Sequence, residues 1–358
     1  MAKRIIGLDI AKTLAMLGVI TIHYAFYSQR YANRIPENIV TVLTNVAVPM
    51  FFMINGFLLF NKKYDEEKHL HKILRMLEVL IVWKIVTLPT VAGIQGFEIT
   101  KNKAAVYLFG GAYDSIGYFW FINALIAVYI IFPILKYGFD YTEDRRIVKR
   151  LTIVVCGFVF GVNALDDMFS ICSSPFGLHA NNPFSALNEY NIFGKYSYVL
   201  AYFLIGGMLS SIISFLKKHF NKSYNIIIVS TIIVSFAGLF ALQRFQAKTQ
   251  GVAFYVINGY QNVFVLLMSL GTLILLLGTE SVGGIANRIF SMTGANTLGV
   301  YYLHYILIVL FARVVSDFQQ GVLPLIVNLL VILLLYGVAL MITLMMKHIP
   351  IVRNLFLG

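Results

Sequence analysis

The chain alternates between long apolar runs and short polar segments. Each run is bounded by charged, Gly- or Pro-bearing segments, and a helical membrane span needs about 20 apolar residues. We predict ten spans, at residues 9–28, 39–60, 74–96, 117–138, 148–165, 194–216, 224–243, 260–278, 292–314 and 322–346. This pattern predicts an all-α, polytopic integral membrane protein with about ten transmembrane helices. We expect a single membrane-embedded domain over residues 1–358, with no separate soluble domain.

Composition agrees with this prediction. Hydrophobic residues make up 59% of the chain and charged residues 12%, whereas soluble proteins carry about 25% charged residues. The net charge of +12 would suggest nucleic acid in a soluble protein. Here the basic residues lie mainly in short connecting segments, which indicates membrane orientation and contact with anionic lipid. The two cysteines, Cys156 and Cys172, define no disulfide framework.

The distribution of basic residues predicts the orientation. One set of connecting segments and termini holds 17 Lys and Arg residues, and the other set holds 8. Because cytoplasmic segments carry the excess, we expect a multi-pass protein of the cell (plasma or inner) membrane with both termini cytoplasmic. The longest connecting segment, 166–193, then lies outside. The first apolar run lacks a small-residue cleavage site, so we interpret it as a retained span.

Three ionisable residues mark the first span. At about 100° per residue, Asp9, Lys12 and His23 share one stripe of the helix, with Lys12 and His23 about 16 Å apart along its axis. Ionisable groups inside a bilayer are expensive and usually face a bundle interior or a wet cavity, so the stripe is a candidate site. The alternative is an i,i+3 pair of Asp9 with Lys12 at one membrane surface and His23 at the other.

Other spans carry polar or aromatic residues that could line a pocket. These are Asn55 in the second span, Trp120 and Asn123 in the fourth, and Tyr301 and His304 in the ninth. Each type also has a structural role: an intramembrane Asn can join helices, Trp is often an interface anchor, and a buried His is often a satisfied structural group. His23 and His304 stand on different spans, each among aromatic residues, so both a functional and a structural role are left open.

These groups suggest group transfer across a membrane. His23 can act as a general base. Lys12, Lys72 and Arg75 can hold a phosphorylated donor, and Lys72 and Arg75 stand at i,i+3 on one face of the third span's entry. The sequence contains no metal-ligand motif, Walker loop, nucleophile elbow or dinucleotide fingerprint. We expect no metal and no permanently bound cofactor.

Seven short motifs together resemble the membrane acyltransferase-3 family. They are Leu8, Asp9, Lys12 and His23 in an LD-x-x-K-x10-H pattern, PMFFMINGF at 49–57, the basic helix start at 72–75, FWFINALIAVYIIFP at 119–133, YVLAYFLIGGML at 198–209, TLGVYYLHY at 297–305 and IPIVRNL at 349–355. Each motif is weak alone, but the seven stand in the family's order and cover essentially the whole chain.

The resemblance implies roles for individual residues. His23 matches the family's essential first-span histidine, which would deprotonate an acceptor hydroxyl. Lys12 occupies a basic position that is often arginine and is associated with donor binding, and Lys72 and Arg75 match the basic pair near the phosphates of CoA. Two departures stand out: Lys12 cannot make the bidentate fork of arginine, and Asn55 replaces the serine of many members.

The resemblance also implies a function. Members use acyl-CoA as co-substrate to acylate sugars and cell-envelope polymers, so we expect transfer of an acyl group, most simply acetyl, to a hydroxyl of a surface polysaccharide or lipid-linked glycan. We expect no extra extracytoplasmic hydrolase-like domain of the kind that some members carry. The expected partners are membrane lipid, acyl-CoA and the glycan acceptor, with no nucleic acid; a homo-oligomer is left open. The alternatives are an exporter of polysaccharide or lipid-linked sugar, and a non-catalytic scaffold.

Overall fold

The computed structural model describes residues 4–28, 35–114, 116–141, 145–173, 182–191, 194–220, 223–251, 256, 259–315 and 322–357. Within them the elements are α1 (Ile6–Ser28), α2 (Ile35–Thr44), α3 (Ala47–Phe60), α4 (Glu66–Gln95), α5 (Lys101–Leu108), α6 (Trp120–Tyr141), α7 (Arg146–Cys156), the π-helical η2 (Gly157–Gly161), α8 (Val162–Ser173), the 3-10 helices η4 (Pro183–Tyr190), η5 (Gly194–Tyr196) and η7 (Gly259–Gln261), α9 (Ser197–Phe220), α10 (Tyr224–Gln250), α11 (Val263–Leu277), α12 (Gly284–Ala295), α13 (Thr297–Val315), α14 (Val322–His348) and α15 (Pro350–Phe356). The described part of the chain has one isolated β-bridge, Tyr113 with Ile116, and no strand.

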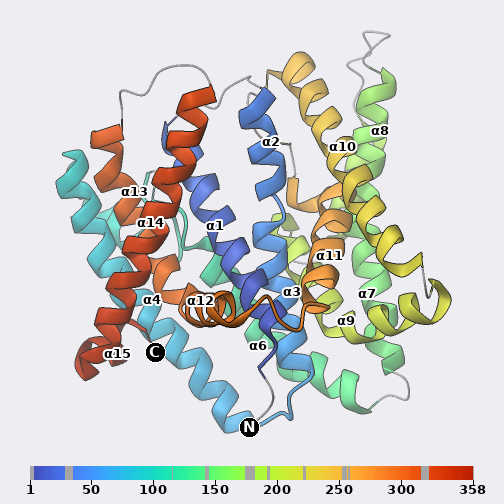
Figure 1. Cartoon of the computed structure of the whole chain (residues 1–358), viewed down its shortest axis with the longest axis horizontal. Helices are drawn as coiled ribbons and strands as arrows, with labels where there is room; N and C mark the ends of the chain where they lie inside the picture. Colours follow the sequence, from blue (N-terminus) through green and yellow to red (C-terminus); the bar gives the residue numbers. More distant parts are fainter. Residues whose placement is uncertain are drawn as a thin grey trace.

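Helix α1 lies in the middle of the bundle. It packs against α2, α3, α11, α12, α13 and α14, with α4, α13 and α14 to one side of it and α7 to α10 beyond α3 on the other (Figure 1). Both chain termini lie at the same end of the bundle, which we call the terminal face; the other end is the opposite face. Helix α12 lies across the bundle instead of along it (Figure 1).

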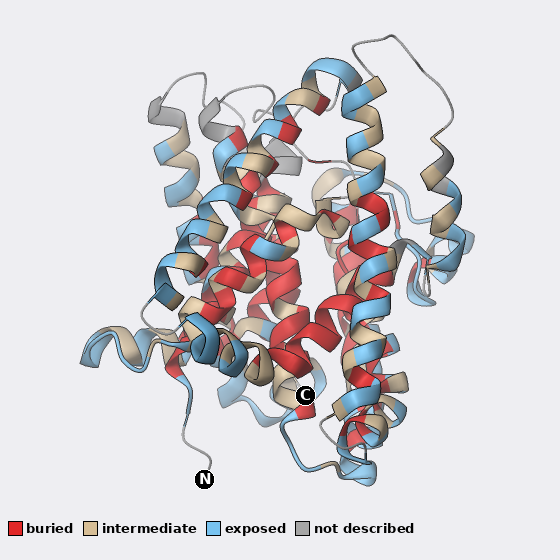
Figure 2. Cartoon of the chain, turned by 90° about the vertical axis from the view of Figure 1, so that its right-hand side faces the viewer, coloured by how far each residue is buried: buried red, intermediate tan, exposed pale blue. Residues whose placement is uncertain are grey.

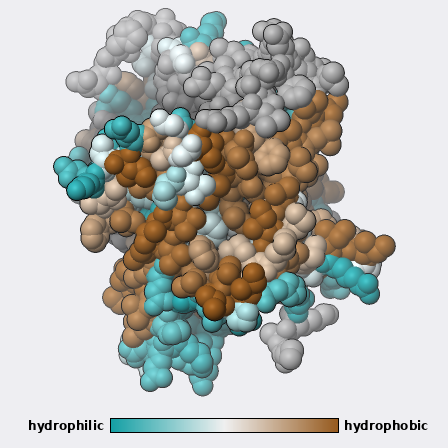
Figure 3. Space-filling model, turned by 90° about the vertical axis from the view of Figure 1, so that its left-hand side faces the viewer, coloured by the Kyte–Doolittle hydropathy of each residue, from teal (hydrophilic) through white to brown (hydrophobic). Residues whose placement is uncertain are grey.

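The predicted fold class is confirmed. Eight helical segments of the described chain are long and apolar enough to cross a membrane, and the bent pair Gly284–Ala295 and Thr297–Ala312 makes a ninth if it counts as one span. The predicted span at 260–278 corresponds to α11, which has only 15 residues. Figure 3 shows a band of hydrophobic side chains across one flank, with hydrophilic ones gathered below it.

Three segments differ from the sequence prediction. The second span is interrupted at Asn45 and Val46, before Pro49, which sits in the first turn of α3 where a missing N–H is tolerated. The ninth bends by 72° between its two arms. The fifth continues through η2 and α8 to Ser173, so the predicted outer segment 166–193 begins with helix, and its residues 174–181 lie outside the described ranges.

Glycines bring α3 and α9 into close contact at the centre of the bundle, where buried residues concentrate (Figure 2). A Cβ added to Gly56 would lie 2.0 Å from the Phe203 carbonyl oxygen, and one added to Gly206 would lie 2.0 Å from the Met53 carbonyl oxygen. Small residues allow this approach because no side chain stands between the two backbones. Such close packing matters in lipid, where apolar burial alone does not drive helix association. The contact fixes α3, which carries Asn55, against the rest of the bundle.

Candidate active site

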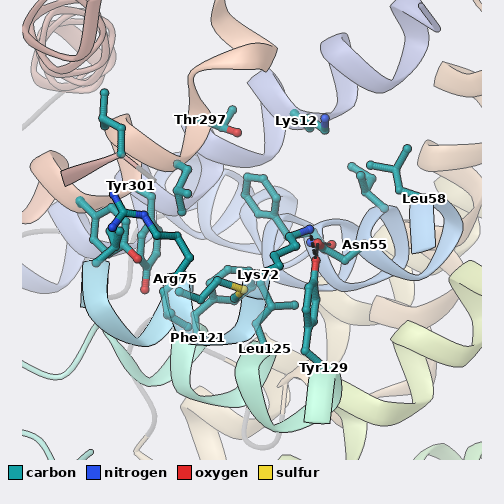
Figure 4. Close-up of a pocket in the computed structure, with 18 of the residues that line it drawn as sticks. Lys12, Asn55, Leu58, Lys72, Arg75, Phe121, Leu125, Tyr129, Thr297 and Tyr301 are labelled. Carbon is teal, nitrogen blue, oxygen red and sulfur yellow. Dashed lines mark hydrogen bonds between the residues drawn. The ribbon is translucent and has the colours of Figure 1, made fainter. Parts of the chain in front are cut away.

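A cavity of about 530 Å³ opens between α1, α3, α4, α6 and α13. We call it the basic cavity, because Lys12, Lys68, His71, Lys72 and Arg75 all line it. The rest of its lining is mainly apolar and aromatic side chains. Figure 4 shows Lys72 and Tyr129 converging on Asn55, with Lys12 and Thr297 at the other side of the view. The cavity combines several cations with an apolar interior, which suits a ligand with an anionic head and a long thin tail.

The start of α4 supplies most of the positive charge. Asp65 caps this helix, since its side chain accepts a hydrogen bond from the Lys68 backbone N–H at 3.1 Å. The four basic residues of α4 that line the cavity then follow at the spacing i, i+3, i+4 and i+7, so all of them point to one face. Lys68 and Arg75 also pair with carboxylates on their own segment, Lys68 with Asp65 at 2.5 Å and Arg75 with Glu78 at 2.8 Å.

A chain of hydrogen bonds links α4, α6 and α3 along the cavity wall. The Lys72 ammonium donates to the Tyr129 hydroxyl at 3.0 Å, and that hydroxyl donates to Asn55 Oδ1 at 3.1 Å. The Lys72 ammonium also lies 4.8 Å from the centre of the Tyr129 ring. His69 stacks on the same ring and its Nε2 contacts the Tyr129 backbone carbonyl at 2.8 Å. Lys72 is therefore held in a defined position beside the cavity.

The stripe on α1 divides into three separate environments. Asp9 is buried and pairs with Arg4, whose Nε lies 2.5 Å from Asp9 Oδ2; Arg4 also donates to the Ser291 carbonyl. The ion pair at Asp9 is therefore with Arg4 and not with Lys12. Lys12 instead lines the basic cavity, and it makes no hydrogen bond or salt bridge with another described residue. An unpaired ammonium inside a bundle favours an anionic ligand.

His23 forms a pair with His304. Their Nδ1 and Nε2 atoms lie 3.0 Å apart, and His304 is completely buried. His304 Nδ1 contacts the Tyr301 carbonyl. Because a carbonyl can only accept, Nδ1 of His304 carries the proton, and its Nε2 accepts from His23 Nδ1–H when both rings are neutral. This arrangement leaves Nε2 of His23 unprotonated, which is the state that a general base requires.

A small pocket of about 30 Å³ lies beside His23 and is lined by it. We call it the histidine pocket. Tyr118 packs edge-on against both imidazoles, with ring centres 6.3 Å from His23 and 5.2 Å from His304. Trp120 also lines this pocket. The pocket is therefore a mostly aromatic compartment around a single base.

The other predicted pocket residues are split between cavities. Asn55 and Tyr301 line the basic cavity, and Tyr301 lines the histidine pocket as well. Asn123 lies in a third cavity, of about 290 Å³, where its amide donates to the Gly110 carbonyl at 3.0 Å and where Trp120 forms another part of the lining. The structure thus brings Lys12, Lys72 and Arg75 together, and sets His23 with His304 apart from them.

The lining residues that sequence reasoning missed include Lys68, His71, Tyr129 and Thr297. Lys68 and His71 share the helical face of Lys72 and Arg75, so extending that spacing by one turn would have found them. Tyr129 lies within an apolar run, and its hydroxyl becomes notable only when Lys72 and Asn55 meet it. Thr297 follows directly on the bend between α12 and α13, which sequence reasoning did not predict.

A bundle of many membrane-spanning helices with a basic cavity and a separate histidine pair defines an integral membrane protein with polar groups gathered inside its core. A family model described as an acyltransferase domain, Acyl_transf_3, matches residues 5–346. The chain therefore belongs to the membrane acyltransferase-3 family and is an acyltransferase with multiple membrane-spanning helices. No curated protein and no solved structure matched the chain. Family membership favours the enzyme over the exporter and scaffold alternatives.

Proposed function

We propose that the protein transfers an acyl group, most simply acetyl, from acyl-CoA to a hydroxyl of a cell-surface polysaccharide or lipid-linked glycan. The observation that carries this proposal is the arrangement of the two compartments. A cavity with a basic mouth reaches into the bundle and borders the histidine pocket, where the hydrogen bond at His23 Nδ1 leaves Nε2 of that ring free.

The basic cavity would hold the donor. CoA carries several phosphates on its nucleotide and a thioester at the end of a long pantetheine arm. Lys72 and Arg75 would bind phosphate at the mouth, where charge-assisted hydrogen bonds are strongest. Lys12, Asn55 and the Tyr129 hydroxyl line the same cavity and would contact the rest of the donor. The basic mouth lies at the terminal face, so cytoplasmic acyl-CoA requires the cytoplasmic termini that the loop charges predict.

His23 would act as the base. Its Nε2 takes the proton of the acceptor hydroxyl while the oxygen attacks the thioester carbonyl carbon. A C–O ester bond forms, the C–S bond breaks, and the CoA thiolate leaves with the proton returned from His23 as the free thiol. Holding the thioester next to the acceptor hydroxyl supplies part of the rate by proximity, and the base typically contributes 10²–10⁴-fold.

Acyl transfer by membranes carrying His23 variants tests this function. Membranes of a strain lacking the gene, complemented with each variant, receive acetyl-CoA labelled in the acetyl group, and label in glycan is counted. His23→Ala and His23→Gln are both expected to lose at least about 10²-fold in rate, because neither side chain can take a proton at neutral pH. His219→Gln is the control, since His219 is an exposed histidine in the last turn of α9.

The result separates the proposal from its alternatives. Near-parental labelling by either His23 variant would show that His23 is structural. Normal labelling of glycan by the membranes of a His23 variant, together with loss of that glycan from the surface of intact cells, would point to export instead of transfer. Thermal stability in detergent close to the parent shows that a loss of rate is chemical.

A further inference from the structure

Three aromatic residues separate the basic cavity from the histidine pocket. Phe51 of α3, Phe121 of α6 and Tyr301 of α13 line both compartments. We call these three residues the aromatic wall. Any group that passes from the basic cavity to His23 must pass this wall, because the same side chains face both spaces.

Contacts among the three rings make the wall continuous. The Phe121 ring centre lies 5.9 Å from that of Phe51 and 5.5 Å from that of Tyr301. Both pairs have inclined rings, at 62° and 52°, which is a favourable packing of aromatic faces and edges. Phe121 therefore occupies the middle of the wall and touches both of its neighbours.

The wall is rigid on one side and adjustable on the other. Tyr301 is 6% exposed, and its hydroxyl donates to the Tyr118 backbone carbonyl at 2.5 Å, so this ring is tied in place. Phe51 and Phe121 are half-buried and have no polar atom that could fix them. Rotation of these two side chains is the smallest change that would join the two compartments.

The space beyond the wall is small. The histidine pocket has about 30 Å³, against about 530 Å³ for the basic cavity. A cavity needs roughly 10–15 Å³ on this kind of measure to hold one water molecule, so the pocket has room for about two. A methyl and a carbonyl fill such a space, whereas each added methylene must displace one of the lining side chains.

The geometry points to Phe121, supported by Phe51, as the residue that selects the acyl group by size and restricts transfer to two-carbon chains. This inference rests on the proposed function, in which the acyl end of the donor enters the histidine pocket first. One methylene that does not fit a pocket of fixed size changes kcat/KM by roughly 10- to 200-fold. Truncating Phe121 enlarges the pocket toward the basic cavity and removes this discrimination.

A comparison of donors with acyl chains of different length tests the inference. Membranes carrying the full-length protein receive acetyl-, butyryl- or hexanoyl-CoA labelled in the acyl group, and the ratio of kcat/KM for butyryl to acetyl is measured from label in glycan. Phe121→Ala is expected to raise this ratio at least about tenfold, and Phe51→Ala to raise it less. Phe121→Trp, which adds bulk, is expected to lower the transfer of both the butyryl and the acetyl group. Phe57→Ala is the matched control, because Phe57 is a half-buried phenylalanine of α3 that lines neither compartment.

Each outcome is decisive for one of the two proposals. Absence of transfer from every donor by the parent protein overturns the proposed function. Equal use of acetyl- and butyryl-CoA by the parent, or an unchanged ratio in Phe121→Ala with acetyl transfer intact, overturns the inference alone. If the alanine variant does not fold, Phe121→Leu serves the same purpose, with a smaller rise of the same ratio expected and an unchanged ratio again overturning the inference.

Discussion

His304 Nε2 lies 3.0 Å from His23 Nδ1, and this contact joins the first span of the chain to the longer arm of its bent ninth segment. The direction of the hydrogen bond follows from the second contact of His304, with the Tyr301 carbonyl. Under the proposed function, His304 would act on the reaction through His23, as a positioning residue that selects one tautomer of its neighbour.

Replacing His304 is expected to lower kcat with little change in the KM for acyl-CoA. His304→Ala removes the acceptor for His23 Nδ1–H, so the ring can adopt the wrong tautomer; loss of an orienting group costs up to about 10⁴-fold in other enzymes. His304→Gln is expected to recover part of the rate, since its side-chain oxygen can accept the same hydrogen bond. Steady-state kinetics on the two variants decide the point. Equal rates for both variants, or a change in KM alone, would contradict the positioning role.

The donor end can be tested by binding alone. Arg75→Ala removes a guanidinium from the mouth of the basic cavity and is expected to weaken CoA binding roughly 10- to 150-fold, the equivalent of about 1.5–3 kcal/mol for a charged hydrogen bond. Calorimetry with CoA and detergent-purified protein measures it. Arg288→Ala is the control, because Arg288 is exposed on α12 and does not line the cavity. Equal affinities for the two variants would assign Arg75 to lipid headgroups instead.

The helical architecture was predictable because each span is indicated by its own apolar run, without reference to distant parts of the chain. The relation among Asp9, Lys12 and His23 was only partly predictable for the same reason: their common stripe is a property of one helix, but their partners are not. Arg4 forms an ion pair with Asp9, and His304 forms a hydrogen bond with His23. Lys12 lines a cavity that α4 and α6 help to enclose.

The parts of the site that sequence reasoning missed depend on contacts between distant segments. Tyr129 reads as one more aromatic residue in an apolar run until Lys72 and Asn55 are placed beside it. The bend at Asn296 has no proline and only the weak helix-stop signals of Gly294 and Asn296, yet it brings Thr297 to the cavity. Such features require the packing of several helices at once, which periodicity and charge counts do not contain.

Two glycine substitutions, one at the α3–α9 contact and one on the exposed face of α4, are expected to have different effects on stability. Gly206→Ala places a methyl group 2.0 Å from the Met53 carbonyl oxygen, which is backbone and cannot swing aside, so overpacking should lower the melting temperature by the equivalent of about 1–3 kcal/mol. Gly93→Ala, in the exposed part of α4 with no atom within 4 Å of the new methyl, should leave it unchanged or raise it, since alanine favours a helix over glycine. Thermal unfolding in detergent measures both. A Gly206→Ala protein as stable as the parent would mean that the two helices do not approach so closely.

The orientation is open to a labelling experiment. In a background lacking Cys156 and Cys172, single cysteines replace Ala186 in η4 and Ser223 before α10, both of which are exposed. With cytoplasmic termini, an impermeant thiol reagent on intact cells is expected to label Ala186→Cys and to spare Ser223→Cys. Labelling of both positions after membrane disruption shows that both thiols are reactive. The reverse pattern on intact cells would invert the topology and with it the side from which the donor enters.

The central position of α1 has a consequence for how the protein is made. This helix is synthesised first, but α11 to α14, which surround it, are synthesised last. At about 5–20 residues per second, the 281 residues between His23 and His304 take roughly 14 to 56 seconds to translate. Arg4 and Asp9 are five residues apart and can pair as soon as the start of α1 forms. His23 can pair with His304 only after α13 has been synthesised. A chain released from the ribosome before that point already carries the basic face of α4, but it lacks His304 and therefore the hydrogen bond that orients the His23 imidazole.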